Sequence, residues 1–432
     1  MSTPLTYRQA LGAFSRDARL YLASASLMGF TIFGGVYSLL LNLYLLRLGY
    51  GPEFIGLVNA AALLGWALAC LPAGWLGRRW GSRRSMVSGM GVAMAGYLLL
   101  PFCELVPAGP WREAWLVATY LIGNVAISLY DVNSQPFLAE ASTPAERDHL
   151  FSVQAALWPL AGFVGSLVGG MLPSLCAGML RTSTDSPGPY RYPLIISALT
   201  LSFGAWALSR THEHRPSGAA SSTGGLPAPP PPRARQAIPP LLIPFLGCLM
   251  FLQGSGEGAA RTFFNVYLDA ALKTPTTRIG LLVAIGQLVA APAALLMPVA
   301  AKRWGHRRVF LWGTLGIAVG MVPLALIPRW TAAGFGYMAV IALVSLTRPA
   351  VMVYLMEIMP QELRTTMSGV YTMAMGLSWS AVALGGSRLI TSLGYPAFFL
   401  AAAACTVASA AAFALAGRKN GLGVRGYDGA SA

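Results

Sequence analysis

The stretch Gly74-Trp-Leu-Gly-Arg-Arg-Trp-Gly-Ser-Arg-Arg84 joins two long apolar segments, and its core repeats later in the chain. Arg79-Trp80-Gly81-x-Arg83-Arg84 recurs after 224 residues as Arg303-Trp304-Gly305-x-Arg307-Arg308. Three shorter matches keep the same order at offsets of 217 to 224 residues: Asn42-Leu-Tyr44-Leu with Asn265-Val-Tyr267-Leu, Ile55-Gly56-Leu57 with Ile279-Gly280-Leu281, and Glu140 and Arg147 with Glu357 and Arg364. This order and spacing indicate an internal duplication of the chain.

The composition favours lipid as the solvent of this chain. Of the 432 residues, 55% are hydrophobic and only 10% are charged, whereas about a quarter of the residues in a soluble domain are charged. A membrane-spanning helix needs about 20 apolar residues. The sequence predicts twelve such spans, at 20–46, 54–76, 85–106, 114–139, 150–173, 192–209, 241–268, 279–300, 308–328, 333–357, 367–389 and 395–416.

A Pro-, Ser- and Gly-rich stretch at 210–238 separates the two copies and is typical of a flexible linker. We therefore predict an all-α membrane protein with an N-terminal six-helix half at 1–209, a C-terminal six-helix half at 239–416 and a tail at 417–432. Parallel six-helix repeats are the pattern of one transporter architecture.

The basic residues fall mostly on one side of the predicted membrane. If the N-terminus is inside, the two tails and the loops that follow even-numbered spans are inside as well, and these segments hold 20 of the 30 Lys and Arg residues. The positive-inside rule then places both termini and the linker in the cytoplasm. Because this topology accounts for the net charge of +15, we expect no nucleic-acid partner. The dominance of Arg over Lys and the many Ala residues suggest a bacterial inner membrane.

Several site classes are not indicated by the sequence. The five Cys residues are scattered without metal or disulfide spacing, and His212 and His214 stand in the linker without Cys nearby, so we expect no metal. No G-x-x-x-x-G-K-[ST] motif occurs, so ATP is not expected as a cofactor or an energy source. The four His residues are dispersed in loops, so an enzyme is not expected either.

The repeated motifs resemble those of the major facilitator superfamily. The basic stretch with Gly74, Arg78, Arg79, Gly81, Arg83 and Arg84, and its copy with Arg303, Gly305, Arg307 and Arg308, is similar to the family's cytoplasmic signature. The pairs Glu140 with Arg147 and Glu357 with Arg364 resemble its Glu-x6-Arg motif. The resemblance implies that Glu140, Glu357, Arg83, Arg84, Arg307 and Arg308 latch the cytoplasmic side shut in the outward-open state. Arg78 departs from the family's usual Asp, and the arginines could alternatively serve only as topology anchors.

Four charges stand most clearly inside predicted spans, where each costs about 2.5 to 3.5 kcal/mol on insertion scales and therefore needs a partner or a function. They are Asp131, Glu257, Arg261 and Arg348, and the resemblance implies that their helices surround the central cavity. Two polar stripes accompany them, one with Asn124, Ser128, Asp131 and Gln135 and one with Gln253, Glu257 and Arg261. Glu257 and Arg261 form a favourable i, i+4 pair that could handle solute or proton or merely neutralise itself.

Asp131 and Arg348 are 217 residues apart, so the repeat places opposite charges at equal depth. We hypothesise an ion pair that forms when the cytoplasmic side closes. The alternative is that each charge is satisfied within its own half.

The sequence favours a monomeric secondary transporter of a small organic solute, coupled to protons. Gly165-Ser166-Leu-Val-Gly169-Gly170 is similar to an antiporter signature with Ser166 in place of Pro, which favours export. Close helix packing is an alternative explanation of these small residues. An uptake symporter and a transport-inactive sensor on the same fold remain alternatives.

The topology can be tested with single cysteines at Ser222 and Ser186 in a background without native Cys. An impermeant thiol reagent added to intact cells should label Ser186→Cys, whereas Ser222→Cys should react only after permeabilisation. Labelling of Ser222→Cys from outside would refute the predicted topology.

Overall fold

The computed structural model describes residues 14–142, 147–212, 242–359 and 361–419. Up to position 212 the helices are α2 (Arg16–Thr31), α3 (Val36–Arg47), α4 (Pro52–Trp80), α5 (Ser82–Leu99), the 3-10 helix η1 (Leu100–Leu105), α6 (Pro110–Glu140), α7 (Arg147–Leu180) and α8 (Gly188–Ser209). From position 242 they are α9 (Leu242–Val266), the π-helix η2 (Tyr267–Ala271), α10 (Thr276–Trp304), α11 (His306–Leu326), α12 (Trp330–Ile358) and α13 (Gln361–Lys419).

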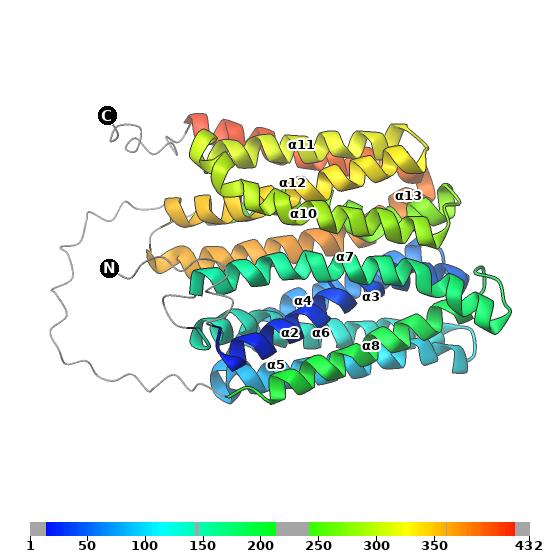
Figure 1. Ribbon diagram of the computed structural model, residues 1–432. Helices are drawn as coiled ribbons and strands as arrows, with labels where there is room; N and C mark the ends of the chain where they lie inside the picture. Colours follow the sequence, from blue (N-terminus) through cyan, green and yellow to red (C-terminus); the bar gives the residue numbers. More distant parts are fainter. Residues whose placement is uncertain (1–13, 143–146, 213–241, 360, 420–432) are drawn as a thin grey trace.

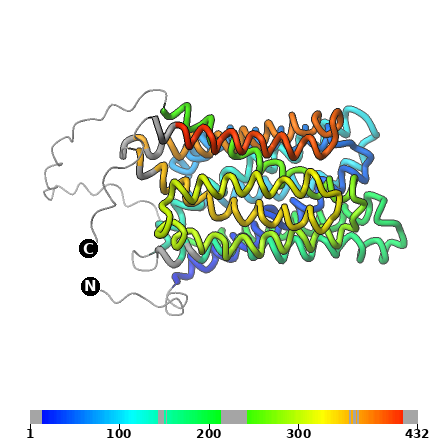
Figure 2. The backbone as a smooth tube through the Cα atoms, turned by 90° about the horizontal axis from the view of Figure 1, so that it is seen from above, coloured from blue at the N-terminus to red at the C-terminus, as the bar shows by residue number. Residues whose placement is uncertain are grey.

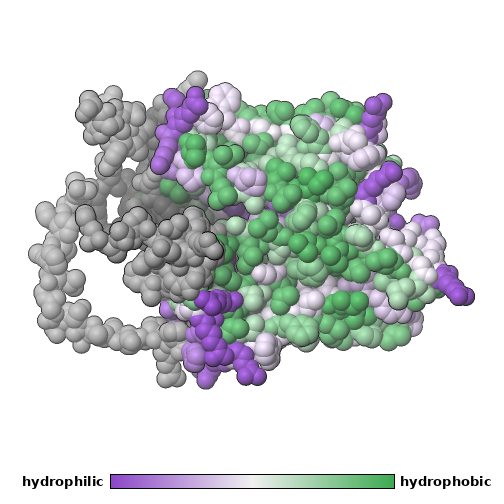
Figure 3. Space-filling model, viewed as in Figure 1, coloured by the Kyte–Doolittle hydropathy of each residue, from purple (hydrophilic) through white to green (hydrophobic). Residues whose placement is uncertain are grey.

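The helices run along one common axis, with α2–α8 on one side of the bundle and α10–α13 on the other (Figure 1). Figure 2 shows the turns between helices gathered at the two ends of the bundle. Exposed Leu, Val and Trp side chains cover the flank, while hydrophilic residues gather towards the two ends (Figure 3). Such an apolar flank matches lipid as the solvent.

The described helices confirm the predicted fold class. Ten of them are long and apolar enough to cross a membrane. One of the ten contains Gly394 with non-helical backbone (φ 82°, ψ 173°), so it comprises two spans in succession. α9 is not among the ten and carries Gln253, Glu257 and Arg261. With both parts of that helix and with α9, the described residues supply twelve spans.

The first span differs from the continuous helix predicted at 20–46, because it breaks between α2 and α3. Gly34 has φ 79°, and a Cβ on Gly35 would overlap the carbonyl oxygen of Phe30. α7 packs against this break, since a Cβ on Gly165 would overlap the same oxygen. Ser166 Oγ donates to the carbonyl of Gly34. Close packing therefore accounts for the small residues of this stretch.

The glycines of the repeated basic motif have a backbone reason to recur. Gly81 and Gly305 have φ of 93° and 77°, a region in which side chains with a Cβ are strained. Each residue ends one long helix and begins the next, which turns the chain sharply at the end of the bundle.

Gly170 and Gly280 bring α7 and α10 into backbone contact between the two groups of helices. A Cβ on Gly280 would lie 2.5 Å from the Cα of Gly170 and 2.8 Å from the carbonyl oxygen of Ser166. Small residues allow such close approach between membrane helices, where lipid supplies no hydrophobic force between them.

Gly280→Ala should lower the melting temperature of the detergent-purified protein, because backbone atoms cannot rotate away from the new methyl group and overpacking costs about 1 to 3 kcal/mol. Gly385→Ala in α13 is the matched control, since a Cβ there meets no heavy atom within 4 Å. An equal or higher melting temperature for Gly280→Ala would contradict the packing argument.

Candidate functional site

Glu257 in α9 is the centre of a charge cluster within the bundle. Its side chain is 2% exposed, so its charge requires local compensation. Arg348 in α12 donates through Nη2 to both carboxylate oxygens of Glu257, at 2.9 and 2.8 Å. Arg261, one helical turn after Glu257, donates through Nε to Oε1 at 2.7 Å. The predicted i, i+4 pair is therefore formed, and Arg348 joins it as a second cation.

Each arginine donates to Glu257 through one nitrogen, Nη2 of Arg348 and Nε of Arg261, but only Arg261 lines the cavities beside the cluster. Arg348 contacts both oxygens and also lies over the indole of Trp379, 5.5 Å from the ring centroid. Arg261 uses only Nε, and neither of its Nη groups has a hydrogen bond to any described residue. Its side chain is 36% exposed. Arg261 can therefore bind a further group.

Two adjoining cavities of about 140 and 180 Å³ lie against Arg261. Both are lined by Ser38, Leu63, Tyr120, Arg261 and Trp379. The smaller adds Asn42, Asn59 and Thr262, and the larger adds Asn124, Asn265 and Gln287 among its polar residues. Side chains from α3, α4, α6, α9, α10, α12 and α13 thus surround a space that has both polar and aromatic walls.

Three buried polar atoms near the cluster have no hydrogen-bond partner among the described residues. They are Gln253 Oε1, Gln287 Nε2 and Trp379 Nε1. A buried polar atom without a partner costs about 1 to 3 kcal/mol, so such atoms commonly mark the place of a ligand or water. Gln287 and Trp379 line the cavity and were not foreseen from the sequence.

The polar stripe of α6 is only partly assembled into this site. Asn124 lines the larger cavity, whereas Ser128 is buried and donates to the carbonyl of Val125. Asp131 accepts from Trp66 Nε1 at 2.9 Å, and its Oδ1 is buried without a partner among the described residues. Gln135 is exposed.

Asp131 and Arg348 do not form an ion pair in this structure. Arg348 bonds Glu257, and Asp131 bonds Trp66. The hypothesis of an ion pair concerns the state in which the predicted cytoplasmic side, the end of the bundle where α2 begins (here called the α2 end), is closed, so it stays a prediction for that state.

The repeated basic motifs make local contacts at the α2 end. Arg83 donates to the carbonyls of Leu208 and Ser209, which end α8. Arg79 and Arg303 lie over the rings of Trp75 and Trp304, at 5.3 and 5.7 Å from the ring centroids. Among the described residues, no ion pair joins Arg78, Arg79, Arg83, Arg303, Arg307 or Arg308 to an acid.

The other residues of the predicted cytoplasmic motifs give little information about a latch. Glu140 is exposed, and both it and Arg84 make interactions with other residues. The side chains of Arg147, Glu357 and Arg364 lie outside the described residues. The latch function therefore stays a prediction.

At the opposite end of the bundle, hydrogen bonds join the two groups of helices. Asn42 in α3 donates to the carbonyl of Thr262 at 2.8 Å, and Asn265 in α9 donates to the carbonyl of Leu39 at 2.9 Å. These bonds are reciprocal, because each asparagine contacts the residue three positions before the other. The sequence repeat contains both asparagines, but the repeat alone does not indicate that they hold the two groups of helices together.

An ion pair strengthens the same end. Arg47 donates to both oxygens of Asp269, at 2.7 and 2.6 Å. We call the contacts of Asn42, Asn265, Arg47 and Asp269 the seam. Further hydrogen bonds between α2–α8 and α9–α13 join Ser174 to Thr277, Tyr190 to Thr276, Ala60 to Ser380 and Glu53 to Thr391.

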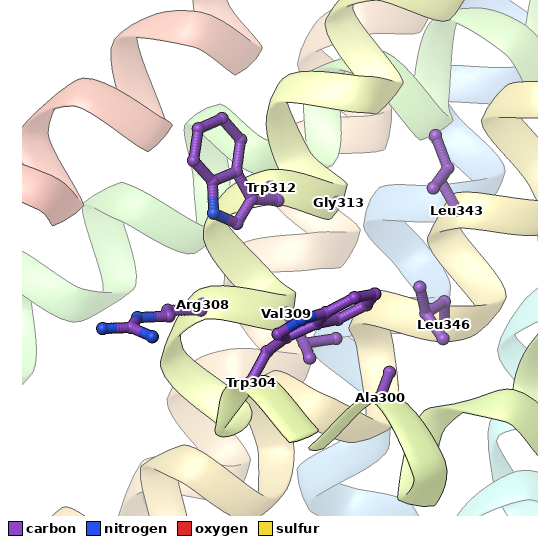
Figure 4. A pocket seen from close by; sticks show the side chains of 8 residues that line it. All are labelled: Ala300, Trp304, Arg308, Val309, Trp312, Gly313, Leu343 and Leu346. Atoms are coloured by element: carbon purple, nitrogen blue, oxygen red, sulfur yellow. The ribbon is translucent and has the colours of Figure 1, made fainter. Parts of the chain in front are cut away.

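A larger hollow of about 620 Å³ lies between α10, α11 and α12 (Figure 4). Its lining is apolar apart from Arg308, which points away from the other side chains in the view. Trp304 and Trp312 in its wall are exposed on the flank that matches lipid. A hollow that lacks convergent polar groups is a poor site for a polar solute, despite its size.

Solved structures of transporters share this fold. The nucleoside transporter NupG, solved as a point mutant, aligns with a TM-score of 0.70 at 14% identity over 92% of this chain and 99% of its own. The inward-open xylose transporter XylE from E. coli aligns with a TM-score of 0.68 at 14% identity over 91% and 94%. The peptide transporter POT, solved as a point mutant in complex with sulfate, aligns at 0.69 and 14% over 97% and 99%. No curated protein matches the sequence significantly.

The family model described as Major Facilitator Superfamily matches residues 20–256 and 246–425. These matches cover nearly the whole chain, including α9 with its charge cluster and both copies of the basic motif. The chain therefore belongs to the Major Facilitator Superfamily.

Proposed function

We propose that this protein is a secondary active transporter that moves a small organic solute by alternating access, with proton-coupled export as its direction. The observation that carries the proposal is a polar cavity between two groups of helices that is sealed at one end by the seam. Secondary transporters of this architecture bind solute near the bilayer midplane, where the repeats meet.

The two halves, 1–209 and 239–416, would rock against each other around this cavity. With the positive-inside topology, the seam lies on the outside, so the described contacts support a state closed to the outside. The linker at 210–238, both termini and the repeated basic loops are then cytoplasmic, in a bacterial inner membrane. We propose a monomer as the working unit, because one chain supplies both halves.

Proton coupling is supported by the contrast between two carboxylates. Protonation of Glu257 would remove the charge that Arg261 and Arg348 share. Asp131 has no cation within ion-pair distance among the described residues, and its Oδ1 lacks a hydrogen bond to them. Asp131 can therefore exchange a proton without the loss of an ion pair, which makes it the better proton carrier.

Uptake by symport is the alternative, and flux into proteoliposomes separates the two. Solutes would first be selected by thermal shift from a panel of metabolites and drugs, because a ligand of the native state raises its melting temperature. A selected solute should accumulate in vesicles that are acidic inside if the protein is an antiporter, and in vesicles in acidic medium if it is a symporter. No flux of any bound solute in either arrangement would contradict transport and favour a sensor.

Glu257→Gln should abolish or uncouple transport while expression stays near normal, because it removes the charge that organises Arg261 and Arg348 with little change of shape. Glu104→Gln is the matched control, since Glu104 pairs with Arg191 at 2.9 Å and lines neither cavity. The measurement is solute flux as a function of pH. If Glu257→Gln transports like the wild type with the same pH dependence, the cluster is structural.

Asn42→Ala combined with Asn265→Ala should open the seam. A hydrogen bond contributes about 1 kcal/mol, so each loss should shift the ratio of open to closed protein about fivefold. The readout is labelling of Ser38→Cys, a cavity position, by an impermeant thiol reagent in a background without native Cys.

Asn133→Ala is the matched control for the seam, because Asn133 is a buried asparagine that donates to Ala73 and Leu129 within one group of helices. Labelling should rise for the double variant and not for the control. Equal labelling rates in all three proteins would show that the asparagines do not hold the outer side closed.

A further inference from the structure

The charges of the cluster formed by Glu257, Arg261 and Arg348 do not balance. Glu257 contributes one negative charge, whereas Arg261 and Arg348 contribute two positive charges. Asp131, the other carboxylate of the predicted site, is bonded to Trp66 instead. Among the described residues, Arg261 is the only charged one that lines either cavity. A surplus positive charge inside a membrane protein is costly unless a partner neutralises it.

From this imbalance we infer that the transported solute is a small organic monoanion whose carboxylate binds to Arg261. The inference rests on the proposed transport function and adds the chemical class of the solute. It follows from which arginine reaches the cavities: Arg261 lines both of them, whereas Arg348 lines neither and donates to both oxygens of Glu257. Arg261 is the surplus cation.

The geometry of Arg261 suits a carboxylate. Both of its Nη groups are without hydrogen bonds to described residues, and the side chain is partly exposed to the cavity. A guanidinium presents parallel N–H groups that match the two oxygens of a carboxylate. The carboxylate of a bound solute would accept hydrogen bonds from the Nη groups of Arg261, while Nε keeps its bond to Glu257.

The indole of Trp379 supplies a second hydrogen-bond donor that has no acceptor among the described residues. Trp379 lines both cavities, and its indole Nε1 is buried without a partner in the described chain. Indole nitrogen is a donor only, so it can be satisfied by an acceptor but not by another donor. An anionic oxygen is the strongest acceptor that a solute can offer.

The size and walls of the cavity narrow the solute further. The two spaces measure about 140 and 180 Å³, and an apolar cavity of about 150 Å³ holds a benzene molecule. Tyr120, Trp379 and the stacked rings of Phe264 and Tyr337, 4.1 Å apart, supply aromatic surface. A monocarboxylate of the size of benzoate fits these dimensions.

The test compares acids with their neutral amides on the purified full-length protein. Benzoate and nicotinate are the acids, and benzamide and nicotinamide match them in shape. Calorimetric Kd values and the concentration dependence of the melting temperature should show binding of at least one acid, with its amide at least tenfold weaker. A neutral sugar such as xylose serves as a probe of a different class.

Arg261→Gln should weaken binding of the acid about ten- to a hundredfold, the value of a hydrogen bond to a charged group. Glu257 keeps Arg348 in this variant, so the protein should remain folded. Arg261→Lys keeps the charge without the fork and should give an intermediate Kd. Arg329→Gln removes an arginine at the start of α12 that lines neither cavity, and it should bind like the wild type.

The inference is overturned if the amides or xylose bind as tightly as the acids, if no acid binds, or if Arg261→Gln leaves the Kd unchanged. Flux in proteoliposomes separates this failure from that of the proposed function. An acid that binds at Arg261 but is not transported would refute transport and leave the anion site. A neutral solute that is transported without any acid binding would refute the anion site and leave transport.

Discussion

The buried carboxylate of Glu257 is the constraint on which the centre of the bundle depends. At 2% exposure it cannot be solvated, and lipid offers no partner, so the protein must neutralise it. Arg348 does so from another helix, which fixes α9 against α12. Glycines flank Glu257 on α9 and allow close contact, since a Cβ on Gly254 would lie 2.8 Å from the hydroxyl of Ser378 and one on Gly258 would lie 3.0 Å from the ring of Trp379. The same packing brings Trp379 into the cavity wall.

The seam shows how a duplicated chain can close one end of a bundle reversibly. Asn42 and Asn265 each donate to a backbone carbonyl of the opposite helix. A carbonyl oxygen has two lone pairs, so it can accept the asparagine as well as its own helical hydrogen bond. When the seam opens, the helices therefore lose no internal bond. Because lipid supplies no hydrophobic force between helices, a few such contacts can decide the closed state.

The sequence predicts the fold well, because the internal repeat and the lengths of the apolar segments can be recognised without knowledge of tertiary contacts. The i, i+4 spacing also predicts the bond between Glu257 and Arg261. The bond between Glu257 and Arg348 joins residues 91 positions apart. The repeat places Asp131 at the same depth in the membrane as Arg348, so the sequence indicates Asp131 as a partner for Arg348 just as well. Depth does not determine the direction in which a side chain points around its helix. The capping of α8 by Arg83 and the orphan donor on Trp379 likewise depend on contacts that only the folded chain creates.

The cavity and the seam share residues, which gives solute binding a direct route to closure. Asn42 and Thr262 line the smaller cavity, and Leu39 and Asn265 line the larger one. Both reciprocal hydrogen bonds are therefore part of the wall that a solute would touch, and Arg261 immediately precedes Thr262 in α9. A ligand shifts a conformational equilibrium only through different contacts in the two states. Here the contacts that differ between an open and a closed seam are themselves the lining of the site, so no long pathway is needed to couple occupancy to access.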